Sequence, residues 1–187
     1  MEINDRIALR VREIRTERDL SLEGLSESSG VSRSMISLIE RGESSPTAVV
    51  LEKLAAGLGV PLASLFDAPA PPADPVSRRK DQLEWRDPAS GYVRRNVSPS
   101  GFPSPLQIVE VVFPAGARVA YETGPRPGVQ HQQIWVLQGT LVVTVDKTRH
   151  ELGAGDCLAM VVDRQITFRN GTAKPVRYAV IIDHRLN

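Results

Sequence analysis

The sequence predicts a two-domain chain, in which an all-α bundle of about five helices is followed by an all-β domain. Three observations support this. Apolar residues recur at helical spacing over residues 1–67, a proline-rich stretch follows, and alternating runs rich in β-branched residues fill the remainder. With 187 residues, the chain is long enough for two domains that each bury a core.

The first helix is expected over about residues 4–18, where one apolar stripe recurs at helical spacing: Ile3, Ile7, Val11 and Ile14. Another helix is expected from Thr47, whose hydroxyl can cap it, to Gly57. A short last helix is expected over residues 62–66. The helices between them come from a separate motif.

The segment 21–41, SLEGLSESSGVSRSMISLIER, predicts a helix-turn-helix. Each of its two short helices has apolar residues at helical spacing: Leu22 and Leu25 in the first, and Met35 or Ile36 with Ile39 in the second. Gly30 can end the first helix with a positive φ, and Ser32 can cap the second. The turn is therefore encoded locally.

The polar side of the second helix, together with the loop after it, carries short or cationic side chains that suit base edges and phosphates. The candidate DNA-binding residues are Ser32, Arg33, Ser34, Ser37, Arg41, Ser44 and Ser45. The alternative is an ordinary helical hairpin with a solvated polar face. Residues 1–67 hold 8 Lys and Arg against 11 Asp and Glu, net −3, so DNA binding requires that the basic side chains cluster.

These residues resemble the Xre-like (lambda-repressor-like) regulators, and the resemblance covers about residues 6–66. The matching positions are Ser26, Gly30, Val31, Ser32, Ile36 and the run Ile39-Glu40-Arg41-Gly42. The chain departs from the family at Ser26, where alanine is common, and at Leu22, where glutamine is common. The resemblance implies a sequence-specific DNA-binding transcriptional regulator and an ion pair between Arg10 and Glu40.

The segment 67–76, DAPAPPADPV, contains four prolines and favours an extended conformation. We therefore expect a domain at 1–67, a linker at 68–80 that ends in the basic run SRRK, and a second domain at 81–187. The chain lacks a run of about 18 apolar residues, which predicts no membrane span. The charged amino terminus and the single cysteine, Cys157, favour a cytoplasmic protein.

After the linker, the apolar pattern alternates and is interrupted about every ten residues by turn-forming residues. The expected strands are residues 92–98, 106–114, 133–137, 140–146, 156–162, 166–170 and 175–183. This pattern predicts a closed barrel or a sandwich. Because no stretch of ten or more residues has a convincing amphipathic helical pattern, a βαβ sheet is not expected.

The spacing of turn residues over about residues 105–183 resembles that of the cupins, small jelly-roll barrels. The positions that carry the resemblance are Gln132, Gly139, Gly155, Val161, Asp163, Ile166 and Asn170. In cupins, three histidines and a glutamate commonly hold a metal ion, but here those positions are residues 125–128 (PRPG), Gln132 and Ile166. His131 should face away from Gln132 on a strand. We therefore expect neither a metal nor another cofactor, and no enzyme activity.

The barrel interior is a candidate site for a small molecule. The candidate ligand-binding residues are Tyr121, Glu122, Arg126, Gln130, Gln132, Trp135 and Met160. We expect a homodimeric regulator that binds a double-stranded DNA operator and responds to an effector, which could be amino-acid-like or an amine. Two alternatives remain, a metal-dependent cupin enzyme fused to a DNA-binding domain, and an antitoxin-like regulator whose barrel only dimerises.

Overall fold

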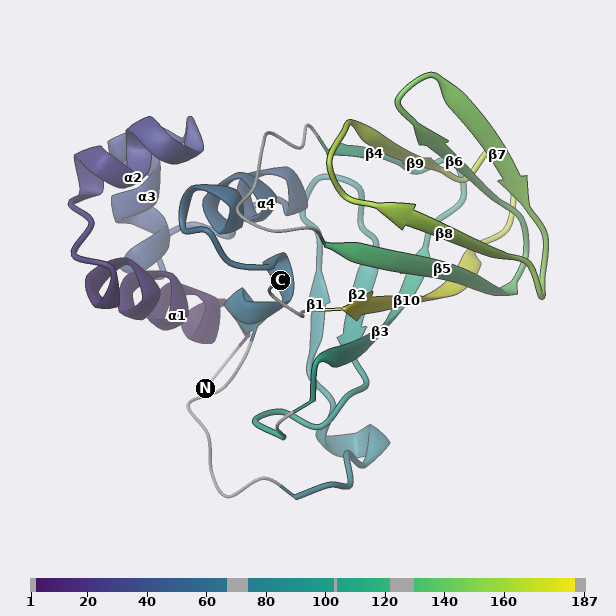
Figure 1. Cartoon of the computed structure of the whole chain (residues 1–187), viewed down its shortest axis with the longest axis horizontal. Helices are drawn as coiled ribbons and strands as arrows, with labels where there is room; N and C mark the ends of the chain where they lie inside the picture. Colours follow the sequence, from purple (N-terminus) through teal and green to yellow (C-terminus); the bar gives the residue numbers. More distant parts are fainter. Residues whose placement is uncertain (1–2, 67–73, 103, 122–129, 184–187) are drawn as a thin grey trace. The chain divides into compact units, whose positions relative to one another are not determined.

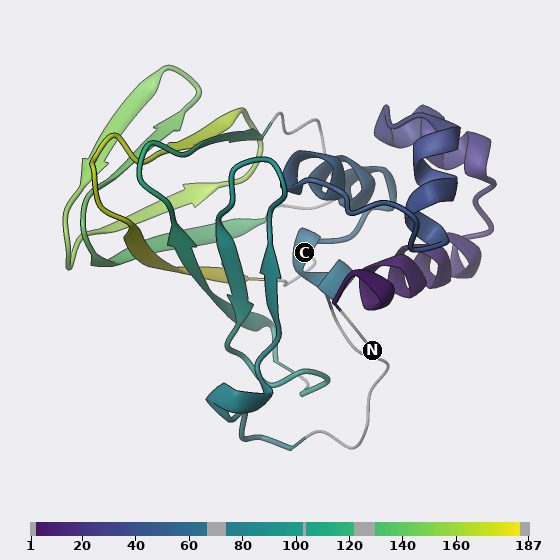
Figure 2. The ribbon, with the colours of Figure 1, turned by 180° about the vertical axis from the view of Figure 1, so that it is seen from behind.

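The computed structural model describes residues 3–66, 74–102, 104–121 and 130–183. The chain divides into two compact units, residues 1–71 and residues 72–187, which Figures 1 and 2 show from opposite sides. The first unit is helical and the second consists mainly of β-strands. The predicted combination of an all-α and an all-β domain is confirmed.

The described part of the helical unit, residues 3–66, contains four α-helices and one 3-10 helix. They are α1 (Ile3–Glu17), α2 (Leu22–Ser29), α3 (Arg33–Glu40), α4 (Ala48–Gly57) and η1 (Leu62–Phe66). The short fifth helix is thus a 3-10 helix, in which the Ser64 amide donates to the Pro61 carbonyl over 3.0 Å. In the parts of the chain that the structure describes, no helix is long and apolar enough to cross a membrane.

Local sequence explains where the central helices begin and end. Gly30 ends α2 with a φ of 67°, and its amide donates to the Ser26 carbonyl over 2.9 Å. The Ser32 hydroxyl caps α3 by accepting from the Met35 amide over 3.3 Å. Thr47 caps α4 in the same way. The predicted roles of Gly30, Ser32 and Thr47 are confirmed.

Apolar side chains of all five helices form the core of the helical unit. The large side chains that are fully buried there are Ile7, Val11, Leu25, Ile36, Ile39, Leu51, Leu54, Leu58 and Leu65. Ile36 and Ile39 are the contribution of α3, which fixes one side of that helix against the core. The opposite side of α3 is left for solvent or a partner.

The second unit consists of two antiparallel sheets. Its strands are β1 (Glu84–Arg86), β2 (Val93–Asn96), β3 (Leu106–Phe113), β4 (Arg118–Tyr121), β5 (His131–Gln138), β6 (Leu141–Val145), β7 (Thr148–Leu152), β8 (Cys157–Val161), β9 (Ile166–Arg169) and β10 (Val176–Asp183). One sheet has the order β1-β2-β3-β10-β5-β8 and the other the order β4-β9-β6-β7. The arrangement is a cupin-like jelly roll.

The seven expected strands are all present, whereas β1, β4 and β7 were not predicted. A short 3-10 helix, Arg79–Asp81, lies where the end of the linker was expected. Asn170 is fully buried and its side-chain amide donates to the carbonyls of Phe113, Pro114 and Lys174 at 3.2, 2.9 and 2.8 Å. This turn residue therefore joins the end of β9 to the loops that follow β3 and precede β10.

Candidate nucleic-acid interface and ligand pocket

The outward side of α3 carries most of the predicted DNA-binding residues. Arg33 and Ser34 are exposed at its first turn, Ser37 is half-buried one turn later, and Arg41 is exposed at its carboxyl end. Ser32 is exposed too, and its hydroxyl lies 3.2 Å from that of Ser34. Four of these five side chains are exposed, as contacts from a helix in a major groove require.

Arg41 is already engaged by a neighbouring carboxylate. Its guanidinium makes two hydrogen bonds of 2.8 Å to Glu43, and a further one to the Ser37 hydroxyl. The hydrogen bond from Arg41 holds the pKa of Glu43 below its ordinary value, so Glu43 stays ionised. A phosphate group that binds Arg41 must therefore compete with the carboxylate of Glu43.

The two serines after α3 contact other elements. The Ser44 hydroxyl lies 3.8 Å from the sulfur of Met35. The Ser45 hydroxyl accepts a 3.0 Å hydrogen bond from the side-chain amide of Asn4. These contacts tie the loop to α3 and to α1. The loop is therefore held in place next to the carboxyl end of α3.

An ion pair links α1 to α3, but its arginine differs from the expected one. Arg15 donates to the two carboxylate oxygens of Glu40 over 2.6 and 2.9 Å, and also to the Leu20 carbonyl over 2.8 Å. Arg10 instead donates to Glu13 and to the Ser64 carbonyl, each over 3.3 Å. The expectation of an Arg10–Glu40 pair is wrong, because it is Arg15, near the carboxyl end of α1, that reaches Glu40.

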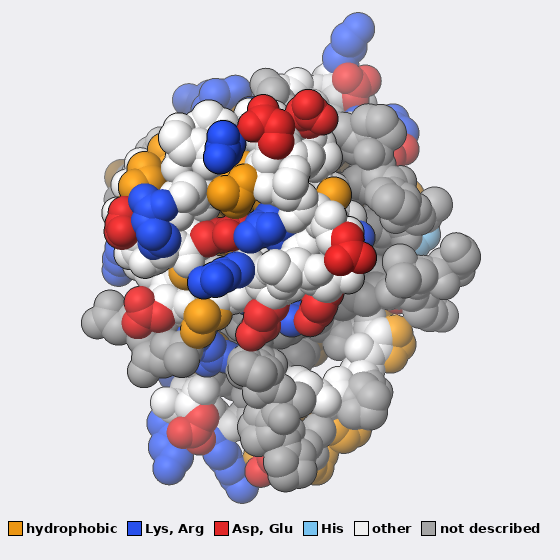
Figure 3. Space-filling view, turned by 90° about the vertical axis from the view of Figure 1, so that its left-hand side faces the viewer, with side chains coloured by type: hydrophobic (Ala, Val, Ile, Leu, Met, Phe, Trp, Pro, Cys, Tyr) orange, Lys and Arg blue, Asp and Glu red, His pale blue; other side chains and the backbone are white. Residues whose placement is uncertain are grey.

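Basic and acidic side chains are interleaved on the helical unit. Figure 3 shows blue and red side chains intermixed on the visible face. Residues 1–67 carry a net charge of −3. Arg33 begins α3 and Arg41 follows its last residue, and both side chains are exposed. Any electrostatic attraction to DNA therefore comes from the local placement of these cations rather than from the overall charge.

The strand register places the candidate ligand residues of the β unit. Gln132 on β5 pairs with Met160 on β8, and in the other sheet Tyr121 on β4 pairs with Ile166 on β9. Gln130, half-buried, immediately precedes β5. Glu122 and Arg126 lie outside the described residues.

Trp135 has a different position from the one expected. Side chains alternate between the two faces of a strand, and Ile134 and Val136 of β5 are fully buried, so Trp135 points outward. It is 48% exposed. The expectation that Trp135 forms a wall of the interior is therefore wrong.

Aromatic side chains and a buried arginine, none of them predicted apart from Tyr121, fill part of the interior. The hydroxyls of Tyr92 and Tyr121 lie 3.1 Å apart, and the rings of Phe168 and Tyr178 stack with centroids 6.0 Å apart. Burial raises the pKa of Tyr121 and Tyr178 well above the ordinary value. Arg94, 6% exposed, acts electrostatically on the tyrosines and counters part of this increase.

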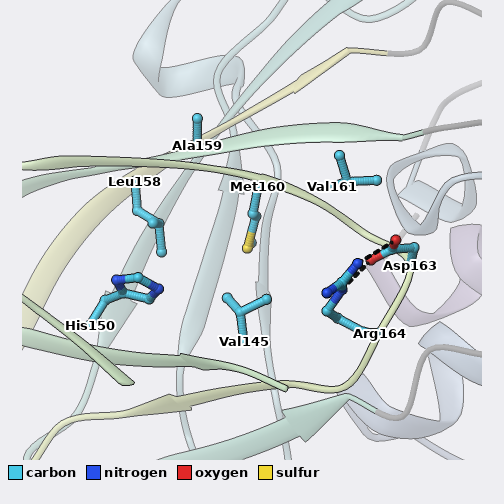
Figure 4. A pocket seen from close by; sticks show the side chains of 8 residues that line it. All are labelled: Val145, His150, Leu158, Ala159, Met160, Val161, Asp163 and Arg164. Atoms are coloured by element: carbon cyan, nitrogen blue, oxygen red, sulfur yellow. Dashed lines mark hydrogen bonds and ion pairs between the residues drawn. The ribbon is translucent and has the colours of Figure 1, made fainter. Parts of the chain in front are cut away.

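A pocket of about 290 Å³ lies where the edge strand β8 faces the β6–β7 hairpin of the other sheet. Figure 4 shows Leu158 and Met160 pointing from β8 toward Val145 and His150, while Ala159 and Val161 point the other way. Asp163 and Arg164, which form an ion pair of 2.6 Å, line its end: the complete lining is Val145, His150, Leu158, Ala159, Met160, Val161, Asp163 and Arg164. Apolar walls with a few polar groups at one end are typical of small-molecule sites.

Comparison with known proteins gives the family. The helix-turn-helix family HTH_3 matches residues 11–65. The HTH-type transcriptional regulator SutR of Escherichia coli (strain K12) is 30% identical over 177 residues, which cover 93% of this chain and 92% of SutR. This chain belongs to the HTH-type transcriptional regulators.

Two further similarities extend over both units of the regulator. The HTH-type transcriptional regulator PuuR of Escherichia coli (strain K12) is 30% identical over 168 residues, 88% of this chain and 87% of PuuR. The crystal structure of an HTH_3 family transcriptional regulator from Vibrio cholerae has 26% identity and a TM-score of 0.79, and covers 98% of this chain and 97% of that one. The match to a whole regulator confirms the combination of domains.

The regulator departs from metal-binding cupins in its side chains. Gln132 and Ile166 replace the glutamate and the last histidine, and residues 125–128 lie outside the described part of the chain. Within the described ranges, no three His, Cys, Asp or Glu side chains lie close enough to hold a metal ion. The residues present therefore do not fit the metal centre that the cupin fold often carries.

Proposed function

We propose that this transcriptional regulator reads operator DNA as a homodimer, with α3 in the major groove, and that a small molecule bound by the jelly roll controls this reading. The observation that carries the proposal is the two-sided character of α3. Ile36 and Ile39 are buried in the core, while Arg33 and Ser34 at the amino-terminal turn are exposed. Residues of this turn contact base edges when a recognition helix enters the groove.

The position of α3 is also restrained on its inner side. Arg15 and Glu40 pair through two hydrogen bonds, with 14% and 8% of their side chains exposed. A planar guanidinium that grips a carboxylate with two bonds fixes orientation as well as distance. This pair supports a fixed presentation of the polar side of α3.

A dimer is proposed because one recognition helix contacts too few base pairs for useful specificity. A single helix-turn-helix contacts a few base pairs, so a two-fold dimer that binds two half-sites gives useful specificity. The outer face of the six-stranded sheet supports a second copy as the partner. It exposes four large apolar side chains on β3 and β5, the two strands that flank β10: Leu106, Ile108, Val112 and Trp135.

The pocket between β8 and the β6–β7 hairpin supports effector binding. Val145, Leu158 and Met160 offer apolar contact. Asp163 and Arg164 at its end pair with each other, and a charged effector that exchanges with this ion pair would gain one negative and one positive partner. An amino-acid-like effector carries an ammonium and a carboxylate that match this pair of charges. An amine would use the carboxylate of Asp163 alone.

The DNA-binding proposal is tested by selecting duplexes from a randomised pool with the full-length protein. Arg33→Ala and Ser37→Ala should then weaken binding to the selected duplex by about tenfold or more, because each removes a polar contact to the groove. Arg149→Ala, which removes an exposed arginine of the β unit, is the matched control and should bind as the wild type does. Unchanged affinity of both α3 variants would contradict the assignment of α3.

The effector proposal is tested by thermal-shift measurements with a panel of amino acids, short peptides and amines. A compound at about 100 times its dissociation constant should add about 2.7 kcal/mol of stability. Leu158→Trp, which fills the pocket, should abolish the shift, whereas Gln133→Ala on the outer face of β5 should leave it unchanged. A shift that persists in Leu158→Trp would place the effector elsewhere.

Two measurements test the proposed dimer and the alternative of a cupin enzyme. Light scattering should give the mass of a dimer for the wild type and that of a monomer for Trp135→Glu, which places a charge on the apolar face. Metal analysis of the purified protein addresses the alternative of a cupin enzyme. Stoichiometric iron, nickel, manganese or zinc would support that alternative.

A further inference from the structure

Two apolar side chains lie on the part of α3 that does not face the helical core. Met35 is 37% exposed and Leu38 is half-buried, whereas Ile36 and Ile39 are buried. Residues three positions apart are neighbours on the surface of a helix, so Met35 and Leu38 form one apolar strip. This strip borders the exposed Ser34. It lies on the side of α3 that is proposed to meet DNA.

The loop after α3 contacts both residues of the apolar strip. The Ser44 hydroxyl can donate a weak hydrogen bond to the Met35 sulfur, from which it lies 3.8 Å, and the Leu38 carbonyl accepts one of 2.9 Å from the Glu43 amide. A methionine has three rotatable bonds, and restraining them before binding lowers the entropy lost on contact with DNA. The contact with Ser44 therefore restrains the Met35 side chain.

The chemistry of the major groove points to one partner for such a strip. Of the four bases, only thymine presents a methyl group there, and apolar side chains recognise it by direct contact. Met35 is the third residue of α3, in the part of a recognition helix that meets base edges. We infer that Met35 and Leu38 contact thymine C5-methyl groups in each half-site and make thymine the preferred base at those positions.

This inference rests on the proposed entry of α3 into the groove. Its test is designed so that a failure of the inference can be told apart from a failure of the proposed function. Duplexes are first selected with the full-length protein, and each thymine of the selected half-site is then replaced in turn by deoxyuridine. Deoxyuridine keeps every hydrogen-bonding group of thymine and lacks only the methyl. At one or two thymines, the replacement should weaken binding by about fourfold, the effect of one buried methyl group.

The same replacements are repeated with Met35→Ala and Leu38→Ala. Each variant should bind the thymine duplex more weakly than the wild type, and should lose its sensitivity to deoxyuridine at its own position. Leu9→Ala, which truncates a 45% exposed apolar residue on α1, is the matched control and should keep the wild-type pattern. Circular dichroism melts of each variant confirm that it is folded.

The possible outcomes bear differently on the inference and on the proposed function. Selected duplexes whose binding depends on Arg33, but is unaffected by deoxyuridine at every thymine, would overturn the inference and leave the proposed function standing. Half-sites without thymine would do the same. If no duplex is enriched, the inference and the proposed function both fail.

Discussion

At the scale of single residues, the mostly buried ion pair between Arg15 and Glu40 restrains α3 against α1. Glu40→Gln keeps the shape of the side chain but leaves the Arg15 charge desolvated without its carboxylate. Because both partners are mostly buried, we expect the free energy of unfolding to fall by about 3 kcal/mol. Urea unfolding of the two proteins measures the difference.

Glu43→Gln is the matched control for this prediction. It removes the carboxylate from an ion pair of similar geometry with Arg41, but both of those side chains are about half exposed. Solvent screens such a pair, so the free energy of unfolding should not change measurably. Equal losses for the two variants would show that the Arg15–Glu40 pair has no special role.

Single residues also show how far sequence reasoning reaches. Gly30 and Ser32 could be assigned because a turn and a cap depend on neighbouring residues alone. The partner of Glu40 could not be assigned, because it depends on how α1 is placed against α3. Trp135 could have been assigned correctly, since it is separated from Gln132 by an odd number of positions and so lies on the opposite face of β5.

At the scale of elements, the close approach of α2 to α4 sets the geometry of the helical bundle. A Cβ atom on Gly57 would lie 2.7 Å from the Cβ of Ser29 and 2.9 Å from its backbone. Gly57→Ala must therefore push the two helices apart, and should lower the free energy of unfolding by about 2 kcal/mol. Thermal or urea unfolding detects this loss.

Gly24→Ala controls for the general effect of alanine in a helix. The new Cβ would meet the Ser21 hydroxyl at 3.5 Å, an ordinary contact. The variant should be as stable as the wild type or slightly more stable, since alanine favours a helix. Equal stability of Gly57→Ala and Gly24→Ala would show that α2 and α4 do not pack tightly at Gly57.

Physical reasons explain why three strands could not be predicted from the sequence. β1 has three residues, too few to show an alternating pattern, and β4 reads RVAY, in which three consecutive apolar residues do not alternate with polar ones. β7 reads TRHEL, in which polar side chains occupy most positions, because it lies at the edge of its sheet. Longer strands such as β3 and β10 were predicted because apolar residues dominate them. The buried Arg94 was missed because a charged residue in a strand is normally expected to face solvent.

At the scale of the whole molecule, tyrosine titration reports on the β unit alone. The chain has three tyrosines, Tyr92, Tyr121 and Tyr178, and all lie in that unit. Burial raises their pKa in the folded state, well above the ordinary value for Tyr121 and Tyr178. Their neutral form therefore contributes stability that is fully present below about pH 10, where unfolded tyrosine titrates, and is lost as the pH rises further.

The measurement is urea unfolding at a series of pH values from about 8 to 11, with tyrosinate absorbance recorded in parallel. The absorbance should rise together with unfolding, and Tyr178→Phe should reduce the loss of stability in this range. Ionisation of all three tyrosines near pH 10 in the folded protein would contradict the buried aromatic cluster.

The central claim for the whole regulator is that the outward side of α3 lies against bases in the complex. Ser34→Cys introduces a thiol on that side, and the exposed Cys157 in the β unit serves as an internal reference. We predict that a saturating amount of the selected duplex slows alkylation of the introduced thiol by about tenfold or more, while that of Cys157 is unchanged. Equal alkylation rates of the introduced thiol with and without DNA would contradict the account.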